Sequence, residues 1–191
     1  MTTATKTKTS GLISWLHGLA ESQDRGRLAA LRRGLLLEPK QFYELYRVVP
    51  AQFLENIGRQ EAERRLMVAS LFAFHPVTFS KEEVASRHRN LGESLRLLAE
   101  RKNPGAKPEE LLPESLKRRM DALLSTHAED LFDHLRQVIR LLKSSDIPVD
   151  WDQLLWDLRG WDHPERSVQW WWSRSFYVGH REKEGGESHV S

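Results

Sequence analysis

The sequence contains no cysteine among its 191 residues, which excludes disulfides, thiolate zinc sites and cysteine nucleophiles. It also lacks the run of about 18 consecutive apolar residues that a membrane-spanning helix needs. The apolar stretch over residues 12–19 is interrupted by Ser14, His17 and Gly18, unlike the unbroken core of a secretion signal. These absences predict a cytoplasmic protein with no membrane partner.

Local signatures of catalysis are missing as well. The chain has no glycine-rich phosphate loop and no nucleophile elbow. His127 and His134 lie seven residues apart without a third ligand at suitable spacing, and Asp146, Asp150 and Asp152 lack the glycine and bidentate glutamate of a calcium loop. We therefore expect no enzyme, no metal, no cofactor and no small-molecule ligand. A hydrolase assembled from scattered His and Asp residues is a remote alternative.

The net charge is only +2, with a pI near 9.0, but the charges are unevenly distributed. Residues 81–107 contain seven Lys or Arg against four Glu, and residues 117–143 contain six against four acids. In residues 146–166 the balance reverses, with six acids against two Arg. A basic middle beside an acidic segment indicates two surfaces with different partners, although an ordinary mixed-charge surface is the alternative.

Apolar residues recur at spacings of three and four, and no period-two alternation is present, so the sequence predicts an all-α fold. We expect a two-lobed helical bundle of about eight or nine helices. The Asn-Pro-Gly turn at 103–105 and the proline at 108 mark a break. This gives an N-terminal lobe over 11–102, a linker over 103–112, a C-terminal lobe over 113–178 and a flexible tail over 179–191.

Side chains suited to cap a helix N-terminus occur at Asp24 and Asp150 and, with a glutamate three residues later, at Ser80 and Thr126. Together with the apolar spacing, these signals predict helices over 59–74, 91–102, 113–124, 126–143 and 167–177.

A basic stripe accompanies the apolar face of the helix predicted over 126–143. Arg136, Arg140 and Lys143 are spaced i, i+4 and i+7, so they share one side of that helix. Guanidinium groups pair with phosphate oxygens without reading sequence, which favours a nucleic-acid backbone as ligand. The alternative is a solvated face, partly neutralised by neighbouring acids such as Asp133.

A second basic cluster lies near the start of the chain. Arg25 and Arg32 are seven residues apart and share a helix face, with Arg33 beside them, while Leu28 and Leu31 are predicted to point inward.

Tryptophan is concentrated towards the C-terminus. Trp151 and Trp161 follow helical apolar spacing and are predicted to be core residues. The triplet Trp170–Trp172 cannot face inward as a whole, so at least one ring is expected to be exposed or at a protein contact. Stacking of unpaired bases is the alternative use of such rings.

Five segments, taken together, resemble the small subunit of type I-E Cascade, the CasB family. Residues 147–162 and 168–177 are similar to its C-terminal signature, and 24–33, 117–124 and 135–143 are similar to earlier stretches in the same order. The chain departs from the family pattern at Met120, where phenylalanine is expected, and at the Trp-Trp-Ser that precedes Arg174. The last residues, 182–191, have no counterpart.

The resemblance implies an all-α, two-lobed, non-catalytic subunit of a crRNA-guided surveillance complex that stabilises the displaced DNA strand of the R-loop. Its implied partners are the backbone and large subunits of Cascade, a second copy of itself, single-stranded DNA and the crRNA backbone. Carried over by motif, the nucleic-acid-binding candidates are Arg25, Arg32, Arg33, Arg118, Arg119, Arg136, Arg140, Lys143 and Arg174.

Two alternatives remain open for this assignment. Arg25 and Arg174 would be structural if they paired with Asp24 or with an acid of the 150–162 segment. The whole chain would be a pure protein–protein scaffold, without direct nucleic-acid contact, if the tryptophan-rich end were its interface.

Overall fold

A computed structural model describes residues 11–86 and 89–179, and all regular structure within these ranges is helical. The all-α prediction is therefore confirmed. The described residues form nine α-helices and three 3₁₀ helices: α1 (Gly11–Glu21), α2 (Arg25–Arg32), η1 (Arg33–Leu36), η2 (Pro39–Arg47), η3 (Ala51–Phe53), α3 (Arg59–Phe74), α4 (Lys81–Ser86), α5 (Leu91–Lys102), α6 (Glu114–Ser125), α7 (Leu131–Lys143), α8 (Trp151–Arg159) and α9 (Ser167–Tyr177).

Most of the predicted helix caps are present. The Asp24 carboxylate accepts a hydrogen bond from the Arg27 amide at 2.9 Å, and the Asp150 carboxylate accepts one from the Gln153 amide at 2.9 Å. Ser80 and Glu83 satisfy each other's backbone amides, as a capping box requires.

The second predicted capping box, at Thr126, is wrong. The Thr126 hydroxyl donates instead to the carbonyl of Ala122 at 2.7 Å, so it serves the end of α6 rather than the start of α7. Helix α7 begins at Leu131, five residues later than predicted, and its N-cap residue Asp130 makes no side-chain capping bond.

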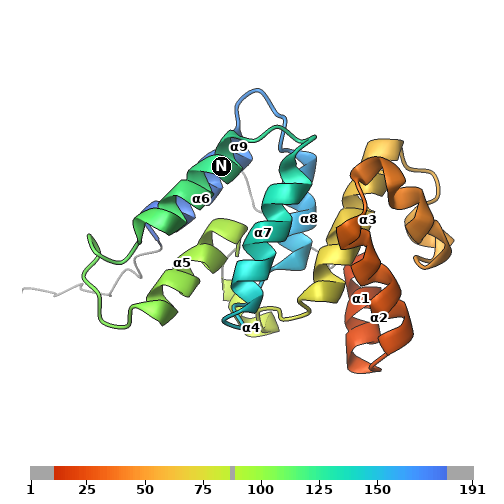
Figure 1. Cartoon of the computed structure of the whole chain (residues 1–191), viewed down its shortest axis with the longest axis horizontal. Coiled ribbons are helices and arrows are strands. Elements are labelled where there is room, and N and C mark those ends of the chain that lie inside the picture. The colour runs from red at the N-terminus through yellow and green to blue at the C-terminus, as the bar shows by residue number, and fades with distance from the viewer. Residues whose placement is uncertain (1–10, 87–88, 180–191) are drawn as a thin grey trace, which may run out of the picture.

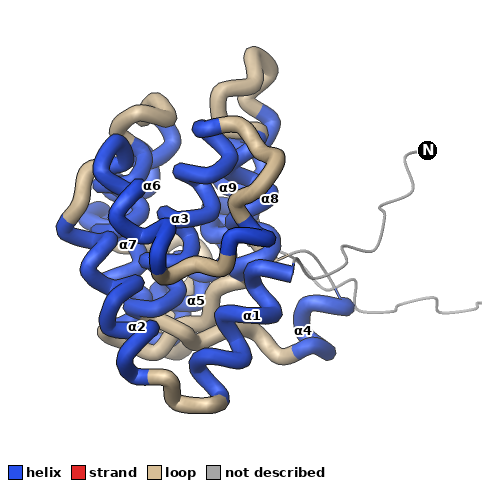
Figure 2. The backbone as a smooth tube through the Cα atoms, turned by 90° about the vertical axis from the view of Figure 1, so that its right-hand side faces the viewer, coloured by secondary structure: helices blue, strands red, loops and turns tan. Residues whose placement is uncertain are grey.

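Helix α3 is the central element of the arrangement. Helices α1 and α2 pack on it from one side and α8 from another, while α5 pairs with α9 and α6 lies beside α7 and α9. Figure 1 shows α7 and α8 between the α1–α2–α3 group and the α5–α6–α9 group, and Figure 2 shows the same helices from the side.

One continuous cluster of buried apolar residues runs through these helices. Edge-to-face ring contacts connect early and late segments, with Phe42 and Phe132 at 5.2 Å and Phe72 and Trp151 at 5.6 Å between ring centroids. Helix α5, which precedes residues 103–112, packs against α9, which follows them. The division into two lobes at 103–112 stays a prediction, and of the predicted tail only Gly179 lies within the described residues.

The tryptophans divide as the helical spacing predicts. Trp151, Trp161 and Trp172 are buried, whereas Trp170 and Trp171 are each 54% exposed. The prediction that the triplet cannot face inward as a whole is therefore confirmed, with two of its three rings at the surface.

A membrane span would need a longer and more apolar helix than any found in residues 11–86 and 89–179.

Candidate nucleic-acid interface

Helices α6 and α7 diverge enough to leave an open groove between them. It consists of two hollows of about 320 and 610 Å³, which share Arg119 and Gln137 as lining residues. We call it the α6–α7 groove, and its lining consists of Ser115, Arg118, Arg119, Ala122, His134, Arg136, Gln137, Val138, Arg140, Leu141 and Ser144.

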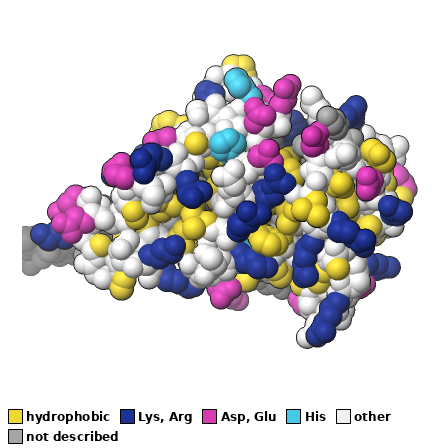
Figure 3. All heavy atoms as spheres, viewed as in Figure 1, with side chains coloured by type: hydrophobic (Ala, Val, Ile, Leu, Met, Phe, Trp, Pro, Cys, Tyr) yellow, Lys and Arg dark blue, Asp and Glu magenta, His cyan; other side chains and the backbone are white. Residues whose placement is uncertain are grey.

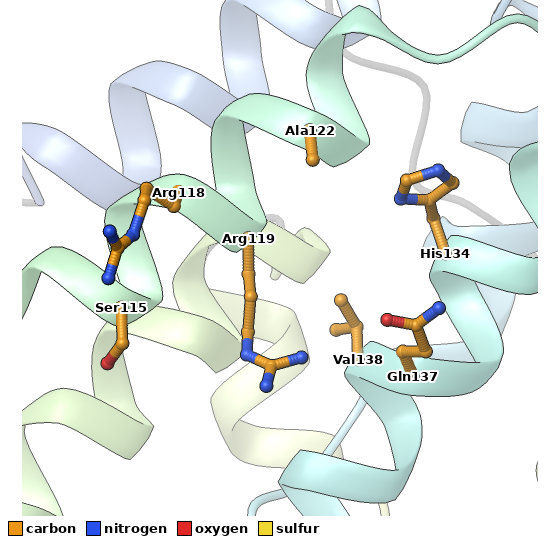
Figure 4. A pocket seen from close by; sticks show the side chains of 7 residues that line it. All are labelled: Ser115, Arg118, Arg119, Ala122, His134, Gln137 and Val138. Carbon is orange, nitrogen blue, oxygen red and sulfur yellow. The ribbon is translucent and has the colours of Figure 1, made fainter.

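Helix geometry explains why these residues meet. The lining residues of α6 are spaced i, i+3, i+4 and i+7 from Ser115, so they occupy one face of that helix. In the close view of Figure 4, the Arg119 side chain extends from α6 into the space in front of Gln137 and Val138 of α7. The groove is thus bounded by one face of α6 and the facing side of α7.

Three arginines of the groove are free to bind a ligand. Arg118, Arg119 and Arg140 are exposed and make no hydrogen bond or ion pair with any described residue. None of the described residues that line the groove is acidic. Figure 3 shows Lys and Arg side chains extending over the middle of this face, with most Asp and Glu near its upper edge and its left end. The groove therefore presents positive charge that no ion pair with a described residue neutralises, while Arg118 lies within electrostatic range of Glu114.

Arg136 lines the same groove but is largely occupied by the protein itself. Its guanidinium donates to the carbonyl of Leu35 and pairs with Asp133, and it lies 5.5 Å from the centroid of the Phe132 ring. The alternative that Asp133 neutralises part of the basic stripe is confirmed for this residue. Arg136 thus links α7 to the N-terminal segment.

Arg32 and Lys143 converge on the end of α3 rather than on the groove. The Arg32 Nε donates to the carbonyl of Ala73 at 2.6 Å, and the Lys143 ammonium donates to the carbonyl of Phe74. The last carbonyls of a helix lack intrahelical partners and carry partial negative charge, so two cations stabilise this end. Burial lowers the pKa of Lys143, and the nearby positive charge of Arg32 lowers it further.

This difference predicts unequal stability effects for two arginines on the basic surface. Arg32→Ala should lower the free energy of unfolding by about 1–2 kcal/mol, because the end of α3 loses a charged donor. Arg140→Ala should change it by less than about 0.5 kcal/mol, because no hydrogen bond or ion pair with a described residue is lost. Urea unfolding of both variants measures the difference, and equal values would contradict the assignment of Arg32 to the α3 end.

The remaining candidates do not line the groove. Arg25 begins α2 and is exposed, and the carboxylate of Asp24 pairs with Arg27 at 3.7 Å. Arg33 caps the end of α2 and is exposed. Arg174 lies 5.6 Å from the centroid of the Trp170 ring, a cation–π contact within α9.

Sequence reasoning missed three polar residues of the groove. Ser115 and Gln137 were not predicted to bind a ligand, and His134 was predicted to be an ordinary histidine and not a metal ligand beside His127. The sequence shows their spacing relative to the arginines. That spacing indicates a shared groove only when α6 and α7 are known to face each other. Among the described residues, no group of three or more His, Asp or Glu could hold a metal ion.

Comparisons with known proteins agree on one family. A family model for CRISPR-associated protein Cse2 matches residues 27–177. A CRISPR-associated protein Cse2 from Thermus thermophilus is 28% identical over 168 residues, covering 86% of this chain and 87% of that protein.

Solved structures show the same fold. The crystal structure of CasB from M. ruber is similar with a TM-score of 0.68 and 28% identity, over 90% of this chain and 94% of that one. A chain of a CRISPR RNA-guided surveillance complex has a TM-score of 0.65 over 88% of this chain and 94% of its own. At 22% identity, the second likeness concerns the fold alone.

Proposed function

Because this chain belongs to the CRISPR-associated Cse2 family, we propose that it is a non-catalytic subunit of a crRNA-guided surveillance complex of the Cascade type. In this role it holds nucleic acid by its backbone and stabilises the displaced DNA strand of the R-loop. Its neighbours are the backbone and large subunits, a second copy of itself and the crRNA backbone.

The observation that carries the proposal is the set of three arginines in the α6–α7 groove that pair with no described residue. Arg118, Arg119 and Arg140 come from two helices and face a groove with no acidic lining residue. Guanidinium forks bind phosphate oxygens in a bidentate manner and do so regardless of base sequence. Such contacts suit a complex in which pairing with the guide RNA supplies the specificity.

The other candidates have supporting roles in this proposal. Arg136, Arg32 and Lys143 shape the surface and add to its positive field while bonded to the protein. Arg25, Arg33 and Arg174 lie outside the groove and add to the positive field around the strand without holding a phosphate directly.

The second candidate function is a pure protein–protein scaffold. It is favoured by the two exposed rings of Trp170 and Trp171, which stack edge to face at 4.5 Å on the surface of α9. In that case the isolated chain would not bind DNA. Substitution of these tryptophans would weaken assembly of the complex more than substitution of the groove arginines would.

Binding of a single-stranded oligonucleotide over a salt series tests the proposal. A triple variant carrying Arg118→Ala, Arg119→Ala and Arg140→Ala removes three phosphate contacts. The log–log salt slope should therefore fall in magnitude by about 2, and the affinity at about 0.1 M salt should fall about 100-fold.

A second triple variant, with Arg25→Ala, Arg33→Ala and Arg174→Ala, serves as the charge-matched control. It removes the same net charge from outside the groove, so it should lose no more than about threefold in affinity at the same salt. The groove assignment fails if the first variant binds like the wild type or if both triple variants lose affinity equally.

A further inference from the structure

A second open hollow lies on the N-terminal part of the molecule, away from the helices of the α6–α7 groove. It has a volume of about 460 Å³ and is bordered by the start of α2, the end of η2 and the segment that follows η2. Three of its lining residues, Arg27, Tyr46 and Arg47, have side chains suited to bind a nucleotide. We call this site the tyrosine hollow, and none of the described residues that line it is acidic.

The 3₁₀ geometry of η2 explains why Tyr46, which lines the hollow, shares one side of this segment with a second tyrosine. In a 3₁₀ helix, side chains at i and i+3 eclipse each other and are about 6 Å apart along the axis. Phe42 and Leu45 are related in this way and are buried. Tyr43 and Tyr46 are related in the same way on another side, and they are 67% and 47% exposed. One side of η2 thus anchors the segment, and another presents two rings in succession to solvent.

Three arginines lie near the ring of Tyr46. The Arg27 side chain is 59% exposed and its contact with Asp24, at 3.7 Å, is the kind of surface pair that contributes little. Arg47 is exposed, its Nε donates to the Glu44 carbonyl at 3.3 Å, and its two terminal nitrogens make no hydrogen bond with a described residue. Arg59 of α3 pairs with a glutamate and also lies within electrostatic range of Tyr46.

We propose that the tyrosine hollow binds an unpaired nucleotide, with its base stacked on Tyr46 or Tyr43 and its flanking phosphates on Arg27 and Arg47. Aromatic faces that stack with bases, together with guanidinium groups for the backbone, are the combination that single-strand-binding proteins use. The inference rests on the proposed function, because it takes a single strand as the ligand. It adds a contact of a different kind, since the groove holds phosphates whereas this hollow holds a base.

A double variant with Tyr43→Leu and Tyr46→Leu isolates the stacking contact. Both rings are exposed, and leucine retains apolar bulk, so the fold should be unaffected. Affinity for a single-stranded oligonucleotide should fall about tenfold, because stacking on an aromatic ring is lost. The salt slope should stay at its wild-type value, because no charge is removed. A 2-aminopurine base in the strand should be less quenched by the variant than by the wild type.

Two controls separate stacking from other causes. Trp156→Leu removes a ring that is 60% exposed and whose neighbour, Arg159, is bound to Glu61, so it should leave affinity unchanged. An oligonucleotide without bases keeps the phosphates, so the wild type and the tyrosine variant should bind it equally.

The outcomes distinguish this inference from the proposed function. One outcome is that the wild type binds the strand, the triple variant of Arg118, Arg119 and Arg140 binds it more weakly, and the tyrosine variant binds it like the wild type. In that case the hollow is not a nucleotide site, and the proposal for the groove stands. An equal loss of affinity by the tyrosine variant for the strand without bases would overturn stacking.

Discussion

Gly92→Ala is expected to lower the free energy of unfolding by about 3 kcal/mol or more, at the upper end of what overpacking costs. Gly92 is a buried residue in the first turn of α5. A methyl group on its Cα would lie 2.1 Å from the carbonyl oxygen of Trp172 and 2.8 Å from its carbonyl carbon. Backbone atoms cannot rotate away as a side chain can, so α9 would have to move as a unit.

Movement of α9 would also disturb what Trp172 holds in place. Its ring is fully buried, packs against Trp161 at 5.0 Å between centroids, and donates a hydrogen bond from Nε1 to Asp157. Displacing the Trp172 backbone therefore strains the contact between α9 and α8 as well as that between α9 and α5. This shared dependence is why the expected effect exceeds that of an ordinary added methyl group.

Gly18→Ala provides a matched control for the same chemical change. Gly18 lies inside α1, and nothing would meet its added Cβ within 4 Å. Alanine in a helix interior is favoured over glycine by about 0.5–1 kcal/mol, so this variant should be more stable than the wild type. Urea unfolding measures the free energy of unfolding of both variants. A Gly92→Ala protein as stable as the wild type would show that α5 and α9 do not pack as described.

The close approach at Gly92 illustrates what could not be predicted from the sequence. Helices α3 and α5 were predicted with the bounds that the structure shows, because their apolar spacing and end signals are local. Which helix packs against which is not a local property. A glycine in a helix signals a close approach only after its neighbour, here the Trp172 carbonyl, has been identified.

The candidate site was also predictable only in part from the sequence. The spacing of Arg136, Arg140 and Lys143 predicted one basic stripe, but the structure gives its members different roles. Arg140 makes no hydrogen bond or ion pair with a described residue, whereas the other two donate to backbone carbonyls of distant segments. A backbone carbonyl is present at every residue, so the sequence does not show which carbonyl a basic side chain will bind. Cations that donate to a neighbouring segment therefore cannot be distinguished from sequence alone from cations that are available to a ligand.

Asp157 should make the stability of this protein fall as pH rises from about 4 to 6. Its carboxyl is 7% exposed and accepts hydrogen bonds from Trp172 Nε1 at 2.6 Å and from Gln153 Nε2 at 2.7 Å. Burial raises its pKa from 3.8 to about 6, although the two hydrogen bonds lower it in part and the charge of Asp150 adds to the rise. The carboxyl thus holds α8 and α9 together in either protonation state.

The direction of the effect follows from proton binding. Between its unfolded pKa of 3.8 and its folded pKa of about 6, Asp157 binds more protons in the folded chain than in the unfolded one. The stability contributed by the protonated form is therefore complete below about pH 4 and is lost as pH rises through 6. A shift of about two pKa units corresponds to about 3 kcal/mol.

Asp157→Asn removes this titration and keeps the shape of the contact. The asparagine carbonyl can accept from Trp172, and the Gln153 amide can turn to accept from the asparagine nitrogen. The free energy of unfolding of the variant, minus that of the wild type, should increase by about 3 kcal/mol between pH 4 and pH 7. Burial lowers the pKa of His75, so this histidine destabilises the fold as pH falls, but it does so in both proteins and cancels in the difference. A difference that is constant with pH would mean that Asp157 ionises as readily in the folded chain as in the unfolded one.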